Sequence, residues 1–119
     1  MKITKSVCEI LKMLSEEAVE QFDNNTFDFI YIDANHAYEY VKHDLELWYP
    51  KLKKGGIIMG DDYTINDIEM CFNTLFGVKK AVDEFGMKNN KTVSLEFTGD
   101  WYYIIGEYYI PSRNWYFVK

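Results

Sequence analysis

The sequence predicts an α/β fold, in which a parallel sheet carries helices and a C-terminal antiparallel strand pair follows. Residues 27–32 (FDFIYI) form an almost continuous apolar run of aromatic and β-branched side chains, which is typical of a strand buried on both faces. Apolar residues then recur at helical spacing over residues 38–52, and residues 57–59 (IIM) form a second short strand. A strand, a helix and a strand in this order indicate a βαβ unit with parallel strands.

The first 22 residues allow two interpretations. Apolar side chains from Ile3 to Phe22 fall at helical spacing, which favours one long helix. Ser15 followed by Glu16 and Glu17 is instead typical of a helix start, with an N-cap residue and two acids in the first turn. This second interpretation makes residues 7–13 a short strand.

The rest of the chain divides at its turn residues. Residues 23–26 and the pair Gly55-Gly56 are predicted turns, and Pro50 bends or ends the helix that begins at Tyr38. We expect a helix over residues 67–76 and another over residues 78–85, the second closed by Gly86 as its C-cap. Residues 92–98, 101–105 and 115–118 are predicted strands, with Pro111 between the last two.

Length and charge limit the class of protein. The chain has 119 residues, which predicts a single domain over residues 1–119. With 48% hydrophobic residues it can form a core, and its net charge of −6 without a basic patch argues against a nucleic-acid partner. No apolar run approaches the roughly 20 residues of a membrane span, and no signal peptide is recognisable at the N-terminus. We therefore expect a soluble, cytoplasmic protein without a membrane partner.

Acidic residues follow both predicted parallel strands. Asp33 comes directly after the first strand, and Asp61 and Asp62 follow the second. The carboxyl ends of neighbouring parallel strands meet at one edge of a sheet, where such folds bind ligands. Three carboxylates gathered there would repel one another, and a hard divalent cation such as magnesium or calcium would remove that conflict. His36, three residues after Asp33, could accept the proton of a substrate hydroxyl.

Each of these residues also has a simpler explanation. An aspartate after a strand is often a turn residue or a helix cap, so Asp33, Asp61 and Asp62 taken singly are better explained as structural. His36 could be an ordinary residue in the first turn of a helix. Only their joint placement at consecutive strand ends favours a site.

Residues 27–63 resemble a known family. The stretch FDFIYIDANHAYEYVKHDLELWYPKLKKGGIIMGDDY has the pattern IDxxHxY, a helix, and then GGxxxxDDY. It is similar to the class I S-adenosylmethionine-dependent methyltransferases, in the branch of small-molecule and sugar O-methyltransferases. GVKKAVDEF at residues 77–85 resembles the helix that follows in this branch, and NWYFVK resembles its closing strand. The resemblance implies a partial Rossmann-like methyltransferase fold.

The resemblance also implies roles for individual residues. Asp33, Asp61 and Asp62 match the positions that hold a divalent metal ion, expected to be magnesium, in metal-dependent members. His36 matches the general base of some members. Ser15 matches a serine close to the adenine of S-adenosylmethionine, so Ser15 and Asp33 are the expected cofactor-binding residues. This match favours the interpretation with a strand over residues 7–13.

The sequence departs from the family pattern at its start. The family's first two strands carry a glycine-rich turn under the methionine moiety and an acidic residue for the ribose hydroxyls. No such turn precedes Val7. The expectation is therefore a chain that lacks about half of the cofactor pocket, either because it is a fragment or because it completes its sheet by pairing with another chain. We expect a homo-oligomer or a missing N-terminal half.

Two functions from different classes follow from these observations. The first is a metal-assisted O-methyltransferase that acts on a small molecule or sugar. The second is a non-catalytic homologue that acts as an assembly or metal-binding module. The missing cofactor elements leave open whether this chain is an enzyme by itself.

Overall fold

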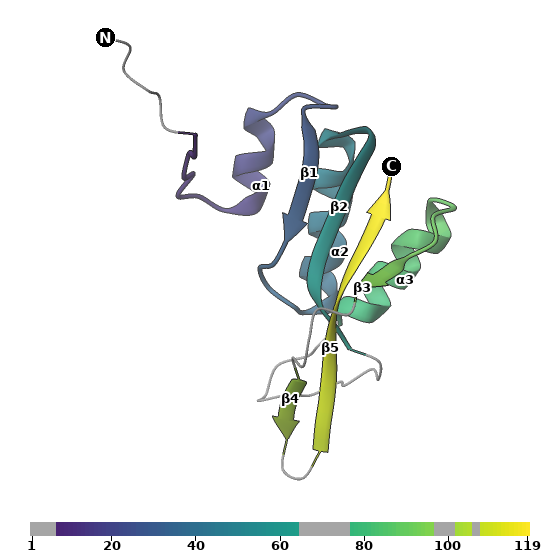
Figure 1. Cartoon of the computed structure of the whole chain (residues 1–119). Helices are drawn as coiled ribbons and strands as arrows, with labels where there is room; N and C mark the ends of the chain where they lie inside the picture. Colours follow the sequence, from purple (N-terminus) through teal and green to yellow (C-terminus); the bar gives the residue numbers. More distant parts are fainter. Residues whose placement is uncertain (1–6, 65–76, 97–101, 106–107) are drawn as a thin grey trace.

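The computed structural model describes residues 7–64, 77–96, 102–105 and 108–119 (Figure 1). Side chains are described over residues 7–64, 77–96 and 113–119. The predicted helix over residues 67–76 lies outside this part of the chain. Within the described part, no helix is both long and apolar enough to cross a membrane.

A mixed sheet forms the centre of the fold. Its strands are β1 (Phe27–Ile32), β2 (Leu52–Thr64), β3 (Ser94–Glu96), β4 (Tyr102–Ile105) and β5 (Tyr108–Val118). The order is β1-β2-β5-β3, and β4, which lies off this path, pairs with β5. β1 and β2 are parallel, whereas β5 is antiparallel to β2, β3 and β4. The predicted parallel pair and the C-terminal antiparallel strand pair are both confirmed.

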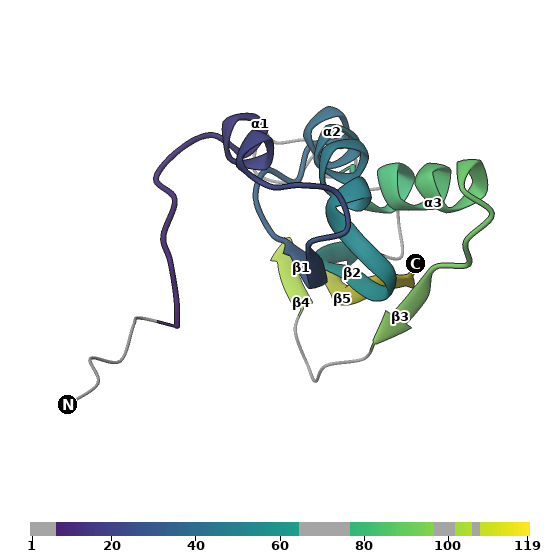
Figure 2. The ribbon, with the colours of Figure 1, turned by 90° about the horizontal axis from the view of Figure 1, so that it is seen from above.

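The helices lie on one side of this sheet, as Figure 2 shows. They are α1 (Ser15–Ala18), which continues into the 3-10 turn η1 (Val19–Gln21), then α2 (Tyr38–Trp48), its 3-10 continuation η2 (Tyr49–Lys51), and α3 (Val78–Lys88). The predicted helix from Tyr38 is confirmed, and Pro50 ends it as expected. The core lies between α2, α3 and the sheet, around Leu45, Ile58, Val82, Trp115 and Phe117.

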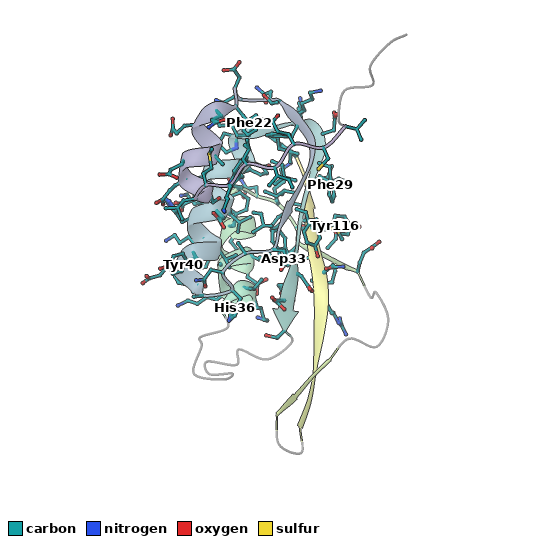
Figure 3. All side chains as sticks on the ribbon, turned by 90° about the vertical axis from the view of Figure 1, so that its left-hand side faces the viewer. Phe22, Phe29, Asp33, His36, Tyr40 and Tyr116 are labelled. Atoms are coloured by element: carbon teal, nitrogen blue, oxygen red, sulfur yellow. The ribbon has the colours of Figure 1, made fainter. Side chains whose placement is uncertain are left out.

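The other face of the sheet is bare in the described part of the chain. Phe29 and Tyr31 of β1 are 52% and 45% exposed, so the prediction of a strand buried on both faces is wrong. Figure 3 shows Phe29 and Tyr116 on the side away from α2. The sequence pattern correctly predicted apolar side chains on both faces of β1. However, the helices of the described residues cover only one face of the sheet.

Three further predictions need correction. Residues 7–14 form neither a strand nor a long helix. Gly55 and Gly56 lie inside β2 as an irregularity in its pairing, since two steps along β1, from Phe27 to Phe29, correspond to five along β2. α3 continues past Gly86 to Lys88, because the side-chain amide of Asn89 donates to the Phe85 carbonyl at 2.8 Å.

Candidate functional site at the carboxyl end of the parallel strands

Asp33 and Asp61 lie at the same edge of the sheet. β1 and β2 are parallel neighbours, and Ile32 lies opposite Gly60. Asp33 directly follows Ile32, and Asp61 directly follows Gly60. This register confirms that the end of β1 lies beside the position of β2 that precedes Asp61, although β2 itself continues to Thr64. It places the carboxylates where α/β sheets bind ligands.

Asp62 occupies a bulge in β2. Between the pairs Gly60–Trp115 and Tyr63–Arg113, β2 has one residue more than β5. Asp62 takes up this extra residue with a φ of 64°, a left-handed conformation that aspartate tolerates better than most residues. The indole N–H of Trp115 donates to the Asp61 carbonyl at 3.2 Å and so holds the bulge from the core side. The sequence predicted a turn into a helix here, whereas the strand continues to Thr64.

His36 shares a small hollow with the three aspartates. The hollow has a volume of about 10 Å³, with Asp33, Asp61, Asp62 and His36 on its rim and Trp115 among its other lining residues. The structure thus brings together all four residues singled out at the strand ends. Among the described residues, however, no group of three or more His, Cys, Asp and Glu side chains is placed to hold a metal ion.

The pKa of Tyr31 depends on the negative charge at this edge of the sheet. Its hydroxyl donates to Asn114 Oδ1 at 3.0 Å. Partial burial raises the pKa of Tyr31 above its ordinary value, and the charges of Asp61, Asp33 and Asp62 raise it further. Because the folded protein resists this ionisation, the contribution of Tyr31 to stability is complete below the ordinary tyrosine pKa. It is lost as the pH rises through the higher pKa of the folded state.

The charge on Asp61 can be tested through Tyr31. We expect Asp61→Asn to lower the pKa of Tyr31, because the largest of the three charge contributions is removed. The measurement is tyrosinate absorbance against pH, with Tyr31→Phe subtracted to isolate the one hydroxyl. Asp28→Asn is the control, since Asp28 lies on the same strand in an exposed ion pair with Lys53. An unchanged Tyr31 titration in Asp61→Asn would contradict the charge cluster.

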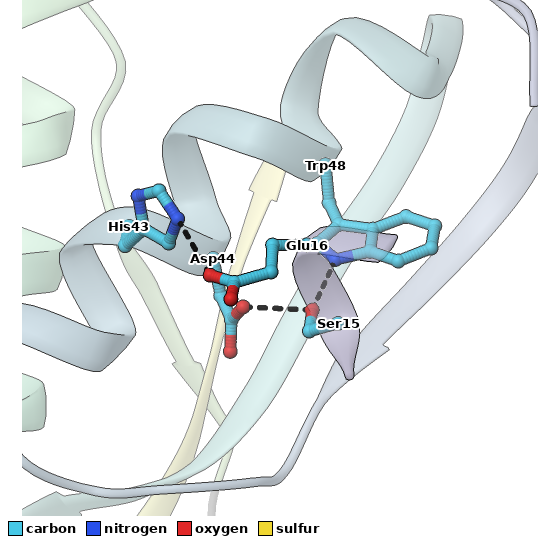
Figure 4. A network of polar contacts seen from close by, with 5 residues as sticks. All are labelled: Ser15, Glu16, His43, Asp44 and Trp48. Carbon is cyan, nitrogen blue, oxygen red and sulfur yellow. Dashed lines mark hydrogen bonds and ion pairs between the residues drawn. The ribbon is translucent and has the colours of Figure 1, made fainter. Parts of the chain in front are cut away.

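Ser15 takes part in a polar network between α1 and α2 (Figure 4). Its hydroxyl donates to Asp44 Oδ1 at 2.8 Å, and the indole N–H of Trp48 donates to the Ser15 oxygen at 2.7 Å. Beside them, His43 and Glu16 form an exposed ion pair at 3.5 Å. Ser15 is the first residue of α1 and Leu14 is its N-cap, so the predicted capping role is wrong. The Ser15 hydroxyl instead forms hydrogen bonds with Asp44 and Trp48 of α2.

A cavity of about 260 Å³ lies between this network and β1. Its polar lining residues include Ser15, Asp33 and Asp44, and its apolar ones include Ile30 and Trp48. The structure therefore brings the two expected cofactor-binding residues, Ser15 and Asp33, to one cavity. Its volume is just below the roughly 300–1,000 Å³ of typical ligand pockets.

Asp44 was missed by the argument from sequence, although a signal was present. Val41, Leu45 and Trp48 form the apolar stripe of α2, and Asp44 lies three residues after Val41 and four before Trp48. Helical spacing therefore places a carboxylate on the buried face, where an aspartate is rarely found without a partner. The structure confirms this reading, since Asp44 is only 8% exposed.

Comparisons with known proteins identify the family and the fold. A family model described as a methyltransferase domain matches residues 2–63. The structure is similar to two solved structures. One is a protein from Klebsiella pneumoniae assigned as an O-methyltransferase (TM-score 0.59, 20% identity), and the other is the O-methyltransferase from Bacillus cereus in complex with SAH (TM-score 0.58, 18% identity). Both matches cover 89% of this chain, but only 47% and 48% of those chains.

One relative matches this chain in sequence over a shorter stretch. An uncharacterized protein of Sinorhizobium fredii, y4gI, is 28% identical over 58 residues, which are 49% of this chain and 6% of that protein. The chain thus spans about half the length of the solved structures that it resembles, and a small part of this relative. The match over residues 2–63 includes β1, α2, β2 as far as Tyr63, and all the candidate site residues. The chain belongs to the methyltransferase domain family and has the Rossmann-like fold of the O-methyltransferases.

Proposed function

We propose that this chain forms the cofactor- and acceptor-facing C-terminal part of an S-adenosylmethionine-dependent O-methyltransferase that acts on a small molecule or sugar. One observation carries the proposal. The cavity beside Ser15 and the hollow beside His36 share Ile32, Asp33 and Ala34 as lining residues. A cofactor in the cavity and an acceptor at the hollow would therefore meet at the carboxyl end of β1.

The chemistry assigned to this arrangement is transfer of the sulfonium methyl group to an acceptor oxygen. The cofactor supplies the methyl group, and the acceptor oxygen forms the new bond as the carbon–sulfur bond breaks. His36 would take the proton of the acceptor hydroxyl, because its ring lies at the rim of the hollow. Ser15 and Asp33 would orient the cofactor, and alignment of the two reacting atoms would supply much of the rate.

A divalent cation, with magnesium favoured by the oxygen ligands, is a further part of the proposal. Asp33, Asp61 and Asp62 line one hollow and together raise the pKa of Tyr31, which supports a concentration of negative charge there. In the described arrangement these residues do not form a metal cluster. We therefore assign no catalytic step to a metal, and propose only that a cation binds weakly after the carboxylates reorient.

Cofactor binding provides the direct test. We expect the 119-residue chain to bind S-adenosylhomocysteine weakly, in the millimolar range, because the cavity of about 260 Å³ holds only part of such a ligand. Asp33→Asn should weaken this binding about tenfold, the size expected for a lost charged hydrogen bond. Calorimetry or saturation-transfer NMR measures both, and the same samples are then titrated with magnesium and manganese.

The control for Asp33→Asn is Asp28→Asn on the same strand, which removes an equal charge from a side chain that is 87% exposed. It should bind S-adenosylhomocysteine as the wild type does. If Asp33→Asn and wild type bind S-adenosylhomocysteine equally, Asp33 has no role in the cofactor site. An equal response of both proteins to the metals would contradict a metal-binding role for Asp33. Micromolar cofactor binding by a monomer would show that the cavity is complete as it stands.

The second candidate function is a non-catalytic assembly module, and the bare sheet face favours it. By register, Phe29, Ile57 and Val118 form one row on this face, and Tyr31, Met59 and Tyr116 form the next. A sheet face that water is to cover normally alternates to polar residues, whereas these six are all apolar or aromatic. For this module we propose that the occupant of the face is a further part of such a fold, since the solved relatives are about twice as long as this chain.

A further inference from the structure

The His36 side of the hollow is bound to α3 at two points. The hydroxyl of Tyr38, the first residue of α2, donates to Glu84 of α3. The backbone amide of Gly77, the N-cap of α3, donates to the His36 carbonyl at 2.9 Å. A glycine is required for this second contact, because a Cβ atom at Gly77 would overlap the backbone of Tyr38. The short segment that carries His36 is therefore held to α3 by one side-chain and one backbone hydrogen bond.

The aspartate side of the hollow is bound to the same helix. Tyr63 directly follows Asp62 in β2, and its hydroxyl donates to Asp83 Oδ1 at 2.7 Å. Lys79 Nζ donates to the other oxygen of this carboxylate at 3.0 Å, from one turn earlier in α3. Successive residues of an α-helix point about 100° apart, so the adjacent carboxylates of Asp83 and Glu84 can bind β2 and α2, respectively. One helix thus holds both sides of the hollow.

α3 also forms part of the hollow itself. Val78, its first residue, is 4% exposed and lines the hollow together with Val41 of α2 and Trp115 of β5. Neither Tyr38 nor Tyr63 is among the lining residues of the hollow or of the larger cavity. The two tyrosines can therefore act on this site only through the backbone segments that they fix.

We propose that Tyr38 and Tyr63 are positioning residues: by binding adjacent carboxylates of α3, they fix the distance between the two sides of the hollow, with His36 on one side and the β2 bulge on the other. The inference rests on the proposed function, in which His36 takes the proton of an acceptor hydroxyl. The base must lie within hydrogen-bond reach of that hydroxyl, and a displacement of about 1 Å can lower the rate about a hundredfold. A tyrosine that fixes this distance affects the reaction without touching either reactant.

The position of His36 can be followed by NMR, because the sequence contains only two histidines. Their imidazole Cε1–Hε1 groups give two signals, which His43→Gln assigns. We expect Tyr38→Phe, which keeps the ring and removes the bond to Glu84, to shift the His36 signal and to leave that of His43 unchanged. Deuterium exchange of the Gly77 amide should become about tenfold faster, the size of one lost hydrogen bond.

Tyr63→Phe should have its effect on the other side of the hollow. The indole N–H of Trp115 donates to the Asp61 carbonyl at 3.2 Å, so its exchange rate measures the contact between the core and the bulge. We expect this exchange to become about tenfold faster in Tyr63→Phe, while the His36 signal keeps its position. In Tyr38→Phe the indole exchange should not change. The two variants thus give opposite patterns, which a general loss of stability cannot produce.

Conservative variants separate the hydrogen bonds from the bulk of the side chains. Glu84→Gln keeps an oxygen that accepts the Tyr38 bond and should resemble the wild type, whereas Glu84→Ala should reproduce Tyr38→Phe. Lys79→Met removes an ion pair from α3 but leaves the bond of Tyr63, and should alter neither measurement. Tyr40→Phe removes a hydroxyl from a side chain that is 59% exposed on α2, and is the matched control for the loss of a tyrosine hydroxyl.

The outcomes separate this inference from the proposed function. An unchanged His36 signal and Gly77 exchange rate in Tyr38→Phe would overturn the inference, as would equal shifts of both histidine signals, which indicate a general disturbance of α2. Because Tyr38 does not line the larger cavity, Tyr38→Phe should bind S-adenosylhomocysteine as the wild type does. If the wild type binds none at millimolar concentration, the cofactor cavity is overturned, whereas the NMR measurements on the free chain still decide whether the tyrosines fix the hollow.

Discussion

Gly60→Ala is expected to lower the free energy of unfolding by about 3 kcal/mol or more, because the strands have no room for a methyl group there. A Cβ atom at Gly60 would lie 2.4 Å from Trp115 Cζ2 and 2.6 Å from the carbonyl oxygen of Ile32. Trp115 is only 1% exposed, and the Ile32 carbonyl belongs to the backbone of the neighbouring strand β1. Neither can move without opening the β1–β2 pair or displacing the indole from the core.

Gly55→Ala is the matched control for this substitution. Gly55 lies in the same strand with a φ of 84°, and an added Cβ would meet no atom within 4 Å. Its cost comes only from the left-handed backbone, about 1–2 kcal/mol. Urea unfolding followed by circular dichroism gives both values. If Gly60→Ala were no more destabilising than Gly55→Ala, the tight packing between Gly60, Ile32 and Trp115 would be wrong.

The same contacts join the core to the site. Trp115 packs against the strand at Gly60 and donates to the Asp61 carbonyl, so a shift of the indole also shifts the bulge that carries Asp62. We therefore expect Gly60→Ala to disturb the hollow at the strand ends as well as the stability. This coupling explains why a glycine is required beside two aspartates, although the aspartates themselves lie at the surface edge of the sheet.

The elements that could be predicted from the sequence are those whose pattern depends on residues that are close together in the chain. The apolar run of β1 and the helical spacing of α2 are local signals, and both elements form where the pattern places them. From their order, the parallel pairing of β1 with β2 followed, and with it the meeting of Asp33 and Asp61 at one edge. The sequence is sufficient here because strand, helix and strand can pack in few ways.

The remaining elements depend on partners that are distant in the sequence. Ser15 has the residues of an N-cap, but Asp44 and Trp48, 29 and 33 residues away, bind its hydroxyl. Gly55 and Gly56 read as a turn, yet Gly55 N donates to the Lys119 carbonyl and Lys119 N donates to the Gly56 carbonyl, which keeps them in the sheet. No local pattern contains these contacts. For the same reason, the exposure of Phe29 could not be read from a run that looks buried on both sides.

Phe29→Asp is expected to convert a self-associating chain into a monomer. Phe29 is 52% exposed at the edge strand of the sheet and lies in one row with Ile57 and Val118, next to the row of Tyr31, Met59 and Tyr116. When the 119-residue chain is prepared alone, Phe29, Tyr31 and Val118 are exposed on this face, and the other three residues of the two rows are half-buried. A second copy then provides the most accessible apolar surface. The edge of β1 away from β2, which no described strand pairs with, adds backbone groups that favour association.

Sedimentation velocity over a range of concentrations distinguishes the cases. We expect the wild type to associate at micromolar concentration, and a charge at Phe29 to weaken this by tenfold or more, since a buried unpaired carboxylate opposes contact between the faces. Tyr40→Asp is the control, because Tyr40 is 59% exposed on α2, on the helical side of the sheet, and should leave association unchanged. A wild-type chain that stays monomeric throughout would contradict the prediction. A discrete dimer would identify a second copy as the natural occupant of this face, whereas a continuous series of larger species would favour the other half of the fold, for which the second copy is only a substitute.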